Sequence, residues 1–412
     1  MKVSVFTLGC KTNLYESQQI VAGLLQAGHD AVIGLCKADV FVLNTCAITA
    51  EAEKKSRQAI ARARKLNPDC RVVVVGCASQ KNALQFSGIS NVTFVKGVHN
   101  KESIVALLDN KGVDVEEIPS VYVHTVNAVQ ERTRAFVKIQ DGCNNFCSYC
   151  IVPYLRGRSR SKDVDVVVQE VASADSNEVV LIGIDLSQYG RDNGTSLAQL
   201  FTKLQGVLAR IRLGSLEPNV VTDEMLQALS KLNFCPHFHL SLQSGCDSVL
   251  ARMNRHYTTQ SYFDAVQKIR KVFDNVAITT DVIVGFCGET DEEFEATCQF
   301  VQRVGFADIH VFPYSPREGT VAYKTMKDLP AETKKLRQER LTEIKHQLHE
   351  AFVEKQLGKT ETVLAEQKKA GYWQGYTPNY TRVYFKGNVS QGDLVKVKLT
   401  RRYLDGAEGE LI

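Results

Sequence analysis

The feature that most constrains this chain is a loop with three closely spaced cysteines, Cys143, Cys147 and Cys150. The loop follows the short apolar segment 136–139, with Asp141 and Gly142 as the turn between them. Such a loop can direct three thiolates to one point, and thiolates are the ligands that iron–sulfur clusters and zinc prefer. Because only three are supplied locally, a four-iron cluster would keep one iron free of protein ligands. Open coordination is typical of catalytic metals.

Two alternatives explain the same cysteines without an open cluster. A structural zinc site needs a fourth Cys or His, and none stands beside the three in the sequence. The other alternative is an accidental group of core cysteines. The open iron–sulfur cluster is the favoured interpretation.

The spacing C-x₃-C-x₂-C, with Tyr149 directly before the last cysteine, resembles the radical S-adenosylmethionine (SAM) superfamily. The resemblance implies that Cys143, Cys147 and Cys150 are catalytic and hold a 4Fe–4S cluster whose open iron binds the amino and carboxylate groups of SAM. An electron then cleaves SAM to methionine and a 5′-deoxyadenosyl radical. Tyr149 is predicted to be one of the cofactor-binding residues.

Composition predicts a cytoplasmic protein without a membrane partner. The chain is 44% hydrophobic and 23% charged, and no apolar run approaches the roughly 18 residues of a membrane span. Its first residues read directly into a strand and lack the features of a signal peptide. Twelve cysteines without an export signal therefore favour metal binding in a reducing compartment over disulfides.

Positive charge is concentrated beside the cysteine loop. Between residues 132 and 162, seven Lys and Arg stand against one acid, Asp141, although the net charge of the chain is only +4. Such a basic collar suits a polyanionic substrate, and a solvated basic loop is the alternative. The seven are Arg132, Arg134, Lys138, Arg156, Arg158, Arg160 and Lys162.

Residues 1–110 alternate strand and helix signals, which predicts an open parallel α/β sheet domain. Cys10, Cys46 and Cys77 each come just after a predicted strand, and ligands gather at the carboxyl ends of strands in such sheets. These three could therefore hold a second cluster with an open iron, whereas Cys36 and Cys70 lack that placement. Strands are expected at 2–8, 40–43, 71–75 and 92–95, and helices at 14–27 and 49–66.

The segments around these cysteines sharpen the resemblance. Residues 7–13 (TLGCKTN), 44–46 (NTC) and 76–77 (GC) resemble the N-terminal domain of the radical SAM methylthiotransferases. The resemblance implies an auxiliary 4Fe–4S cluster on Cys10, Cys46 and Cys77. No Walker A or G-x-S-x-G sequence competes. Residues 111–133 are expected to form a connector with one strand.

Residues 134–330 carry six further strand signals with helices between them, which predicts a partial (β/α)₆ barrel. This is also the shape that the radical SAM resemblance implies. Active residues should lie past the carboxyl ends of these strands, where the cysteine loop itself follows the first. The strands are expected at 136–139, 178–182, 209–213, 237–242, 275–284 and 308–312.

Several residues in these loops are predicted to bind the cofactor. The resemblance implies that Gly183 lets backbone approach the methionyl part of SAM, and Glu217 and Gln243 are expected to form hydrogen bonds to it. Arg255 would reach a carboxylate or phosphate, with a surface salt bridge as the alternative. Gly285 begins a G-F-C-G-E-T segment that resembles the family's G-F-P-G-E-T. Each of these residues is alternatively an ordinary loop or turn residue.

Three other residues of the barrel have simpler expected roles. Cys287 replaces the usual proline of that segment and is expected to be a small apolar residue rather than a ligand. His237 and His239 share one face of a strand. A metal pair is an alternative there to the favoured hydrogen-bonded histidines.

A long charged helix is predicted over residues 331–357, followed at 358–412 by short alternating runs typical of a small β-barrel. The last segment resembles the TRAM domain, an RNA-binding barrel found at this position in the same family. Its aromatic and basic residues suit stacking on RNA or, equally, an aromatic core. These residues are Tyr372, Trp373, Tyr376, Tyr380 and Tyr384, with Lys368, Lys369, Arg382 and Lys386.

Together the resemblances predict a methylthiotransferase with two 4Fe–4S clusters that uses two molecules of SAM per turnover. A radical suits an unactivated C–H carbon, because such a carbon is neither acidic enough for acid–base catalysis nor electrophilic enough for nucleophilic catalysis. The finer motifs, residues 9–13, 44–49 and 140–147, look most like the MtaB branch, which methylthiolates carbon 2 of N6-threonylcarbamoyladenosine at tRNA position 37. Another branch of the family has G-C-Q-M-N where this chain has residues 9–13.

The expected partners are therefore the tRNA anticodon stem-loop, an electron donor such as a flavodoxin or ferredoxin, and a sulfur source. Three alternatives remain open: the branch that acts on N6-isopentenyladenosine, the branch that modifies an aspartate of a ribosomal protein, and a non-catalytic zinc-dependent RNA-binding protein.

Overall fold

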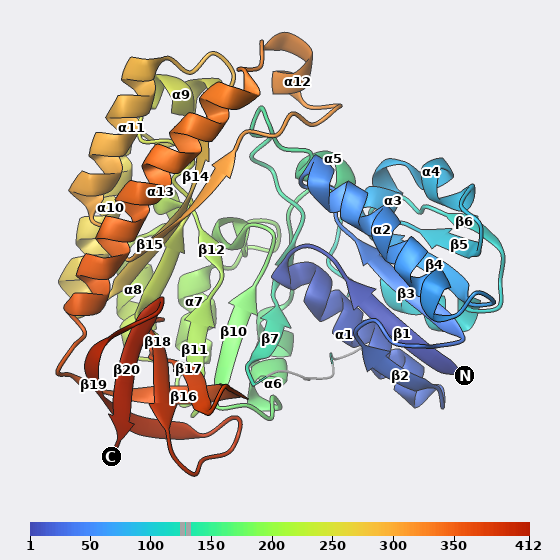
Figure 1. Ribbon diagram of the computed structural model, residues 1–412, viewed down its shortest axis with the longest axis horizontal. Helices are drawn as coiled ribbons and strands as arrows, with labels where there is room; N and C mark the ends of the chain where they lie inside the picture. Colours follow the sequence, from blue (N-terminus) through green and yellow to red (C-terminus); the bar gives the residue numbers. More distant parts are fainter. Residues whose placement is uncertain (124–127, 129–132) are drawn as a thin grey trace.

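The computed structural model of the protein describes residues 1–123, 128 and 133–412, so Arg132 of the predicted collar lies outside the described residues. The fold has three parts in chain order: an α/β part, a central set of parallel strands and a small β-barrel (Figure 1). Within the described part of the chain, no helix is both long and apolar enough to cross a membrane.

The N-terminal part is a six-stranded parallel sheet in the order β2-β1-β3-β4-β5-β6. Separate apolar clusters fill its two faces, one under α1 and η1 and the other under α2 and α4. The strands are β1 (Lys2–Thr7), β2 (Asp30–Ile33), β3 (Val40–Thr45), β4 (Arg71–Gly76), β5 (Val92–Lys96) and β6 (Gly112–Asp114). The helices are α1 (Lys11–Gln26), α2 (Ala50–Leu66), α3 (Cys77–Lys81), α4 (Ala83–Ser87) and the 3₁₀ helix η1 (Lys101–Leu107).

The predicted parallel sheet is confirmed, and so are its four inner strands. Of the two edge strands, β2 has no counterpart among the predicted strands, whereas β6 lies in residues 111–133, where one strand is expected, and pairs with β5. Both strands are short, as is common at the edge of a sheet, and a short strand offers few residues for a sequence pattern.

The central part contains the six predicted strands, all in parallel pairs. They form two sheets, β11-β10-β7 and β12-β13-β14-β15, with a large apolar core between the strands and the outer helices. The main strands are β7 (Ala135–Lys138), β10 (Glu178–Ile182), β11 (Arg210–Leu213), β13 (His237–Leu240), β14 (Ala277–Val284) and β15 (Asp308–Pro313). Short strands are β8 (Gln140–Asp141), β9 (Arg160–Ser161) and β12 (Ser215–Leu216).

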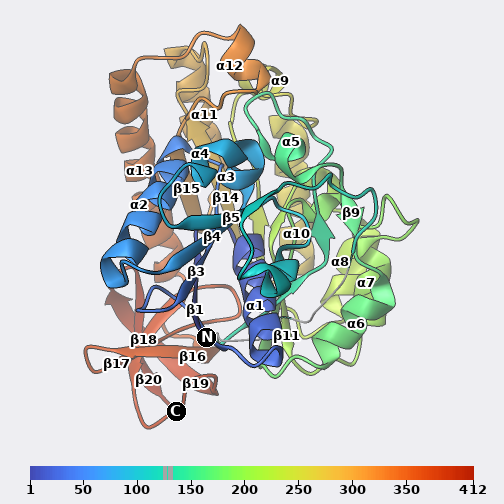
Figure 2. The ribbon, with the colours of Figure 1, turned by 90° about the vertical axis from the view of Figure 1, so that its right-hand side faces the viewer.

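Helices alternate with these strands, as the predicted βα repeats require. They are α5 (Val152–Arg156), α6 (Val164–Ala172), α7 (Leu197–Lys203), α8 (Asp223–Ser230), α9 (Asp247–Arg252), α10 (Thr259–Val272), α11 (Asp291–Val304) and α12 (Val321–Thr325), with the 3₁₀ helices η2 (Leu186–Gln188) and η3 (Pro218–Val220). The N-terminal part lies against one side of the central strands (Figure 2), where Tyr15 of α1 packs with Phe136 and Val180.

The long helix α13 (Ala331–Glu354) crosses the outside of β15 and leads to a closed five-stranded barrel, as predicted (Figure 1). The small barrel docks at the amino ends of the central strands. Arg210 donates to the Thr362 carbonyl at 2.9 Å, and Arg212 to the Pro378 carbonyl at 3.0 Å. Its strands are β16 (Thr360–Lys369), β17 (Tyr372–Tyr376), β18 (Arg382–Lys386), β19 (Leu394–Tyr403) and β20 (Gly406–Leu411).

Most described residues of the predicted basic collar are ion-paired within the protein, which matches neither a site open to a polyanionic substrate nor a solvated loop. Arg156 is buried and bonds Glu16 of α1 at 2.9 Å and Asp141 at 2.8 Å, and Lys138 reaches the same two carboxylates at 2.7 and 2.8 Å. A buried charge is stable only with such partners. Arg134, Arg160 and Lys162 are likewise ion-paired, with Glu178 and Glu366, with Asp141, and with Glu170. Arg158, in contrast, is exposed.

Most aromatic residues of the small barrel also lie inward. Trp373 belongs to its apolar core, and the Tyr384 ring is buried. Tyr380 stacks on His237 of the central strands, with ring centroids 4.7 Å apart, and on Tyr376 at 4.6 Å. The two predicted alternatives for these aromatic residues were stacking on RNA bases and packing in a core. Their contacts favour the second, with Tyr380 also packing against the central strands.

Candidate functional site

The loop with Cys143, Cys147 and Cys150 is held from several sides at the carboxyl end of β7. Gly142 has φ +74°, and a Cβ on it would lie 1.9 Å from the Arg158 carbonyl oxygen, so the chain can turn here only with glycine. Farther along, the Ser148 amide donates to the Met253 carbonyl at 3.0 Å. The loop is thus fixed without its thiols, and the structure brings the predicted residues together.

A buried polar network lies next to these cysteines. Arg255 donates to Cys147 Sγ at 3.2 Å and pairs with Glu217 at 2.9 Å. Asn145 donates to Glu217 and to Asp185, both at 2.8 Å. The Cys143 thiol lies 3.7 Å from the Asp185 carboxylate. Of these residues, Glu217 and Arg255 were predicted as cofactor-binding, whereas Asn145 and Asp185 were missed.

Of the four other predicted cofactor residues, Gly183, Gln243 and Gly285 have clear structural roles. A Cβ on Gly183 would lie 2.9 Å from both Gln140 Oε1 and Leu186, so those side chains fill the space beside it. Gln243, with φ +69°, pairs with β14 through its backbone. The Gly285 amide donates to Glu289 at 2.8 Å, and a Cβ there would meet Lys334 at 2.3 Å. A role of the three in binding SAM stays a prediction.

Tyr149 and Cys287 lie in one apolar cluster beside the loop. The Tyr149 ring meets Phe286 edge-on with centroids 6.1 Å apart. Cys287 is buried, as expected for a small apolar residue, and burial raises the pKa of its thiol.

Cys10, Cys46 and Cys77 all lie at the carboxyl edge of the N-terminal sheet, after β1, β3 and β4. A Cβ on Gly9 would stand 2.9 Å from Cys46 Cβ, so the first two loops touch at a glycine with φ +105°. Burial and, to a smaller extent, the nearby Cys77 and Cys10 raise the pKa of the Cys46 thiol to about 11. The three predicted residues are therefore neighbours.

Arg156 links the two groups of cysteines. It belongs to α5, directly after the loop with Cys143, and donates to Asn13 Oδ1 at 2.9 Å. Asn13 in turn donates to the carbonyls of Leu8 and Thr45, which precede Cys10 and Cys46. The charge of Arg156 acts on Cys46 and interacts with Cys77. One buried guanidinium thus connects the loops of both sites.

The donor sets fit iron–sulfur clusters better than zinc. All six cysteines are free thiols. Across the described residues, neither trio has its three sulfurs within 4.8 Å of one another. Sulfurs on one tetrahedral zinc stand about 3.8 Å apart, because Zn–S bonds are about 2.3 Å long. Among the described residues, neither trio is thus already gathered around one zinc ion, and three thiolates are a donor set that an iron–sulfur cluster accepts.

The histidines on the inner face of the central strands have protein partners. His237 bonds Thr279 at 2.9 Å, as the favoured prediction expects. His239 faces Asp281 at 3.1 Å. With His310, the donor atoms of His239 and Asp281 lie within 4.8 Å of one another. A His237–His239 metal pair is not the arrangement found.

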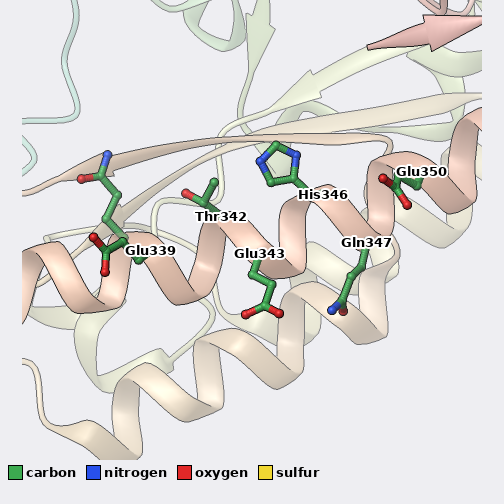
Figure 3. A pocket seen from close by; sticks show the side chains of 7 residues that line it. Glu339, Thr342, Glu343, His346, Gln347 and Glu350 are labelled. Atoms are coloured by element: carbon green, nitrogen blue, oxygen red, sulfur yellow. The ribbon is translucent and has the colours of Figure 1, made fainter. Parts of the chain in front are cut away.

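A separate hollow of about 560 Å³ runs along α13 (Figure 3). Every residue that lines it, including Glu343 and His346, belongs to this one helix. No second element contributes a converging group, so this hollow is a feature of the helix surface.

Comparison with known proteins identifies the family. Residues 137–301 match the radical SAM superfamily, and residues 2–97 match the uncharacterized protein family UPF0004. The threonylcarbamoyladenosine tRNA methylthiotransferase MtaB of Bacillus subtilis is 36% identical over 434 residues, which cover 100% of this chain and 96% of that protein. The chain belongs to the radical SAM methylthiotransferase family.

Family membership means that this enzyme uses SAM and a 4Fe–4S cluster. The tRNA-2-methylthio-N(6)-dimethylallyladenosine synthase of Endomicrobium trichonymphae, a further relative, is 30% identical over 426 residues, which cover 100% of both chains. Among solved structures, the radical SAM methyltransferase TsrM from Kitasatospora setae is similar, with a TM-score of 0.56. At 12% identity over 77% of this chain and 76% of that chain, it supports the fold alone.

Proposed function

We propose that this radical SAM methylthiotransferase modifies carbon 2 of N6-threonylcarbamoyladenosine at position 37 of tRNA. The observation that carries the proposal is similarity to enzymes named for this nucleoside along the whole chain. Beside the Bacillus enzyme, MtaB of Aquifex aeolicus is 37% identical over 413 residues, which cover 96% of this chain and 100% of that protein. The alternative substrate is N6-isopentenyladenosine, the nucleoside class in the name of the Endomicrobium relative.

The proposed reaction uses two 4Fe–4S clusters, one held by Cys143, Cys147 and Cys150 and one by Cys10, Cys46 and Cys77. When bound, the clusters and SAM would supply a radical, a sulfur atom and a methyl group, which is chemistry that protein side chains lack. An electron donor such as a flavodoxin or ferredoxin and a sulfur source complete the proposed set of partners.

The residues of the chain would bind, orient and shield these groups. Arg255 and Glu217 are fixed by each other and by Asn145, so they present oriented polar atoms beside the first cysteine loop. Tyr149 and the apolar cluster around Phe286 would exclude water from one side of that site. We propose Tyr149, Gly183, Glu217, Gln243, Arg255 and Gly285 as the residues that bind SAM.

The small barrel offers exposed cations for the tRNA backbone. Lys396 and Lys398 project from β19, and both are exposed and form no ion pair with the residues that the structure describes. Phosphate contacts of this kind position a nucleic acid without reading its sequence. The other exposed lysines of this surface are Lys368, Lys369 and Lys386.

The test is mass spectrometry of tRNA nucleosides from a strain that lacks the gene. We expect the 2-methylthio form of threonylcarbamoyladenosine to be absent, and to return with the wild-type gene but not with the Cys10→Ala or Cys147→Ala variant. An unchanged level in the deletion strain would reject this substrate. Loss of the methylthio form of isopentenyladenosine instead would establish the alternative.

A further inference from the structure

A cavity of about 360 Å³ lies beside Cys10, between the N-terminal sheet and the inner face of the central strands. Three parts of the fold line it: Cys10 and Lys11 come from the start of α1, Arg134 and Arg212 from the central part, and Tyr380 from the small barrel. Pockets for small ligands typically measure about 300–1,000 Å³. This cavity is therefore large enough for part of a substrate.

Two of the cations in this wall are held rigidly. Arg134 pairs with Glu178 and Glu366, both at 2.6 Å, and Arg212 pairs with Glu178 at 2.7 Å. Their guanidinium carbons lie 5.2 and 4.7 Å from the centre of the Tyr380 ring. These contacts fix the two positive charges at the wall of the cavity before any ligand enters.

Lys11 differs from its neighbours because it has no partner among the described residues. Its side chain is exposed and lines the cavity. It is the first residue of the 16-residue helix α1, whose amino end adds positive potential at the same place. The four cations of this region, Lys11, Arg134, Arg210 and Arg212, outnumber its carboxylates, Glu178, Glu366 and Asp281. Such a wall is complementary to an anion.

We propose that this cavity binds the carboxylate of the N6-threonylcarbamoyl group. Lys11 would pair with the carboxylate directly, and Arg134 and Arg212 would add positive electrostatic potential around it. The inference rests on the proposed function, because that nucleoside carries a carboxylate on the group attached to its base. An isopentenyl group has no charge and would offer Lys11 no anionic partner in the complex. The same cavity therefore selects between the two nucleosides by charge.

Binding of anticodon stem-loops to the full-length, anaerobically reconstituted enzyme tests this role. Three RNAs differ only at position 37: threonylcarbamoyladenosine, the same nucleoside with its carboxylate converted to a neutral amide, and isopentenyladenosine. A hydrogen bond to a charged group predicts roughly tenfold to a hundredfold tighter binding of the carboxylate form than of the amide. We expect Lys11→Gln to lose this preference and to bind the amide RNA as the wild type does.

Two variants serve as controls. Lys11→Arg keeps the charge and should keep most of the preference. Lys37→Gln removes an exposed lysine that does not line the cavity, so it should bind all three RNAs like the wild type. Because two RNAs are compared on one protein preparation, a variant with impaired iron loading still reports its preference.

Each other outcome overturns the inference in a distinguishable way. Equal loss of affinity for the carboxylate and amide RNAs would assign Lys11 to a backbone phosphate. A preference that persists in Lys11→Gln, in an enzyme that methylthiolates threonylcarbamoyladenosine, would refute the carboxylate site and leave the proposed function intact. An enzyme that methylthiolates only the isopentenyl stem-loop would remove both.

Discussion

Three thiols of the candidate cluster sites, Cys46, Cys143 and Cys150, lie where a cation is needed to stabilise their charged form. Burial, followed by the nearby Asp185 carboxylate, raises the pKa of Cys143. Burial, followed by the neighbouring Cys147, raises the pKa of Cys150 to about 12. Metal ligands must be deprotonated, so iron binding at these residues would release protons and offset the burial of charge.

Single cysteine variants separate the two proposed clusters. We expect Cys10→Ala, Cys46→Ala or Cys77→Ala each to lower the iron content from about eight to about four per chain, because each removes one of three ligands. Cys147→Ala should lose the other four. Iron and sulfide analysis after anaerobic reconstitution measures this.

Cys36 and Cys70 supply the matched controls. Neither follows β1, β3 or β4 directly, so Cys36→Ala and Cys70→Ala should keep about eight irons. An unchanged iron content in the Cys46→Ala variant would contradict the second cluster. Zinc in place of iron in the wild type would favour the zinc-dependent alternative.

At the level of single residues, the sequence predicted where the cysteines lie in the fold better than it predicted the ion-pair partners of the basic residues. All six cysteines follow strands that were predicted from the residues just before them. This was possible because apolar runs and glycines mark the end of a strand locally. The ion pairs of Arg156 and Lys138 could not be predicted in the same way, because Glu16 is more than a hundred residues away in the chain. A cluster of basic residues looks the same in sequence whether its acids are near in space or absent.

At the level of elements, the turns after the strands decide where the thiols point. The turn between β1 and α1 brings Gly9 against Cys46, with φ +105° and no room for a Cβ. Strands β3 and β4 end in a similar contact, since a Cβ on Gly76 would lie 2.6 Å from the Thr45 carbonyl oxygen. Tight strand-to-helix turns thus hold the three loops at one edge.

Gly9→Ala tests this close approach. The backbone conformation costs an L-residue about 1–2 kcal/mol, and the added Cβ also collides with Cys46. We expect the variant to fold and to lose the iron of the second site, from about eight to about four per chain. Gly28→Ala is the control, because φ is +79° there and no atom lies within 4 Å of the new Cβ. Equal iron loss in both variants would show that strain alone, not the contact with Cys46, is responsible.

The strands and helices themselves were largely predictable, whereas the contacts of the polar side chains on the inner faces of the strands were not. The strands of the central part have apolar residues facing the outer helices, which gives a clear signal. Their inner faces carry Arg212, His237 and Asp281, whose partners come from other strands or from the small barrel. The aromatic residues of the C-terminal barrel were ambiguous for the same reason, since docking and RNA stacking use identical side chains.

At the level of the whole molecule, buried ion pairs join the N-terminal and central parts. Arg156→Met leaves Glu16 and Asp141 each without one partner in a buried site. We expect it to lower the free energy of unfolding by about 3–5 kcal/mol, measured by urea denaturation of the full-length protein. Arg62→Met changes an exposed arginine of α2 and should shift that free energy by less than about 0.5 kcal/mol. Similar stability of the two variants would mean that the network does not hold the parts together.

The small barrel lies at the amino ends of the central strands (Figure 1), and Lys396 and Lys398 are exposed on its strand β19. The double variant Lys396→Gln/Lys398→Gln should weaken tRNA binding without changing which nucleoside is preferred, because phosphate contacts carry no sequence information. Each lost contact lowers the slope of log affinity against log salt concentration by about 0.7–0.9, so the slope should fall by up to about two. Filter binding between low and moderate salt measures this slope.

Lys231→Gln/Lys271→Gln is the control, because it removes two exposed lysines near the outer helices α8 and α10 and should leave the slope unchanged. If both double variants changed the slope equally, the effect would come from net charge, and the small barrel would have no special part in holding the tRNA.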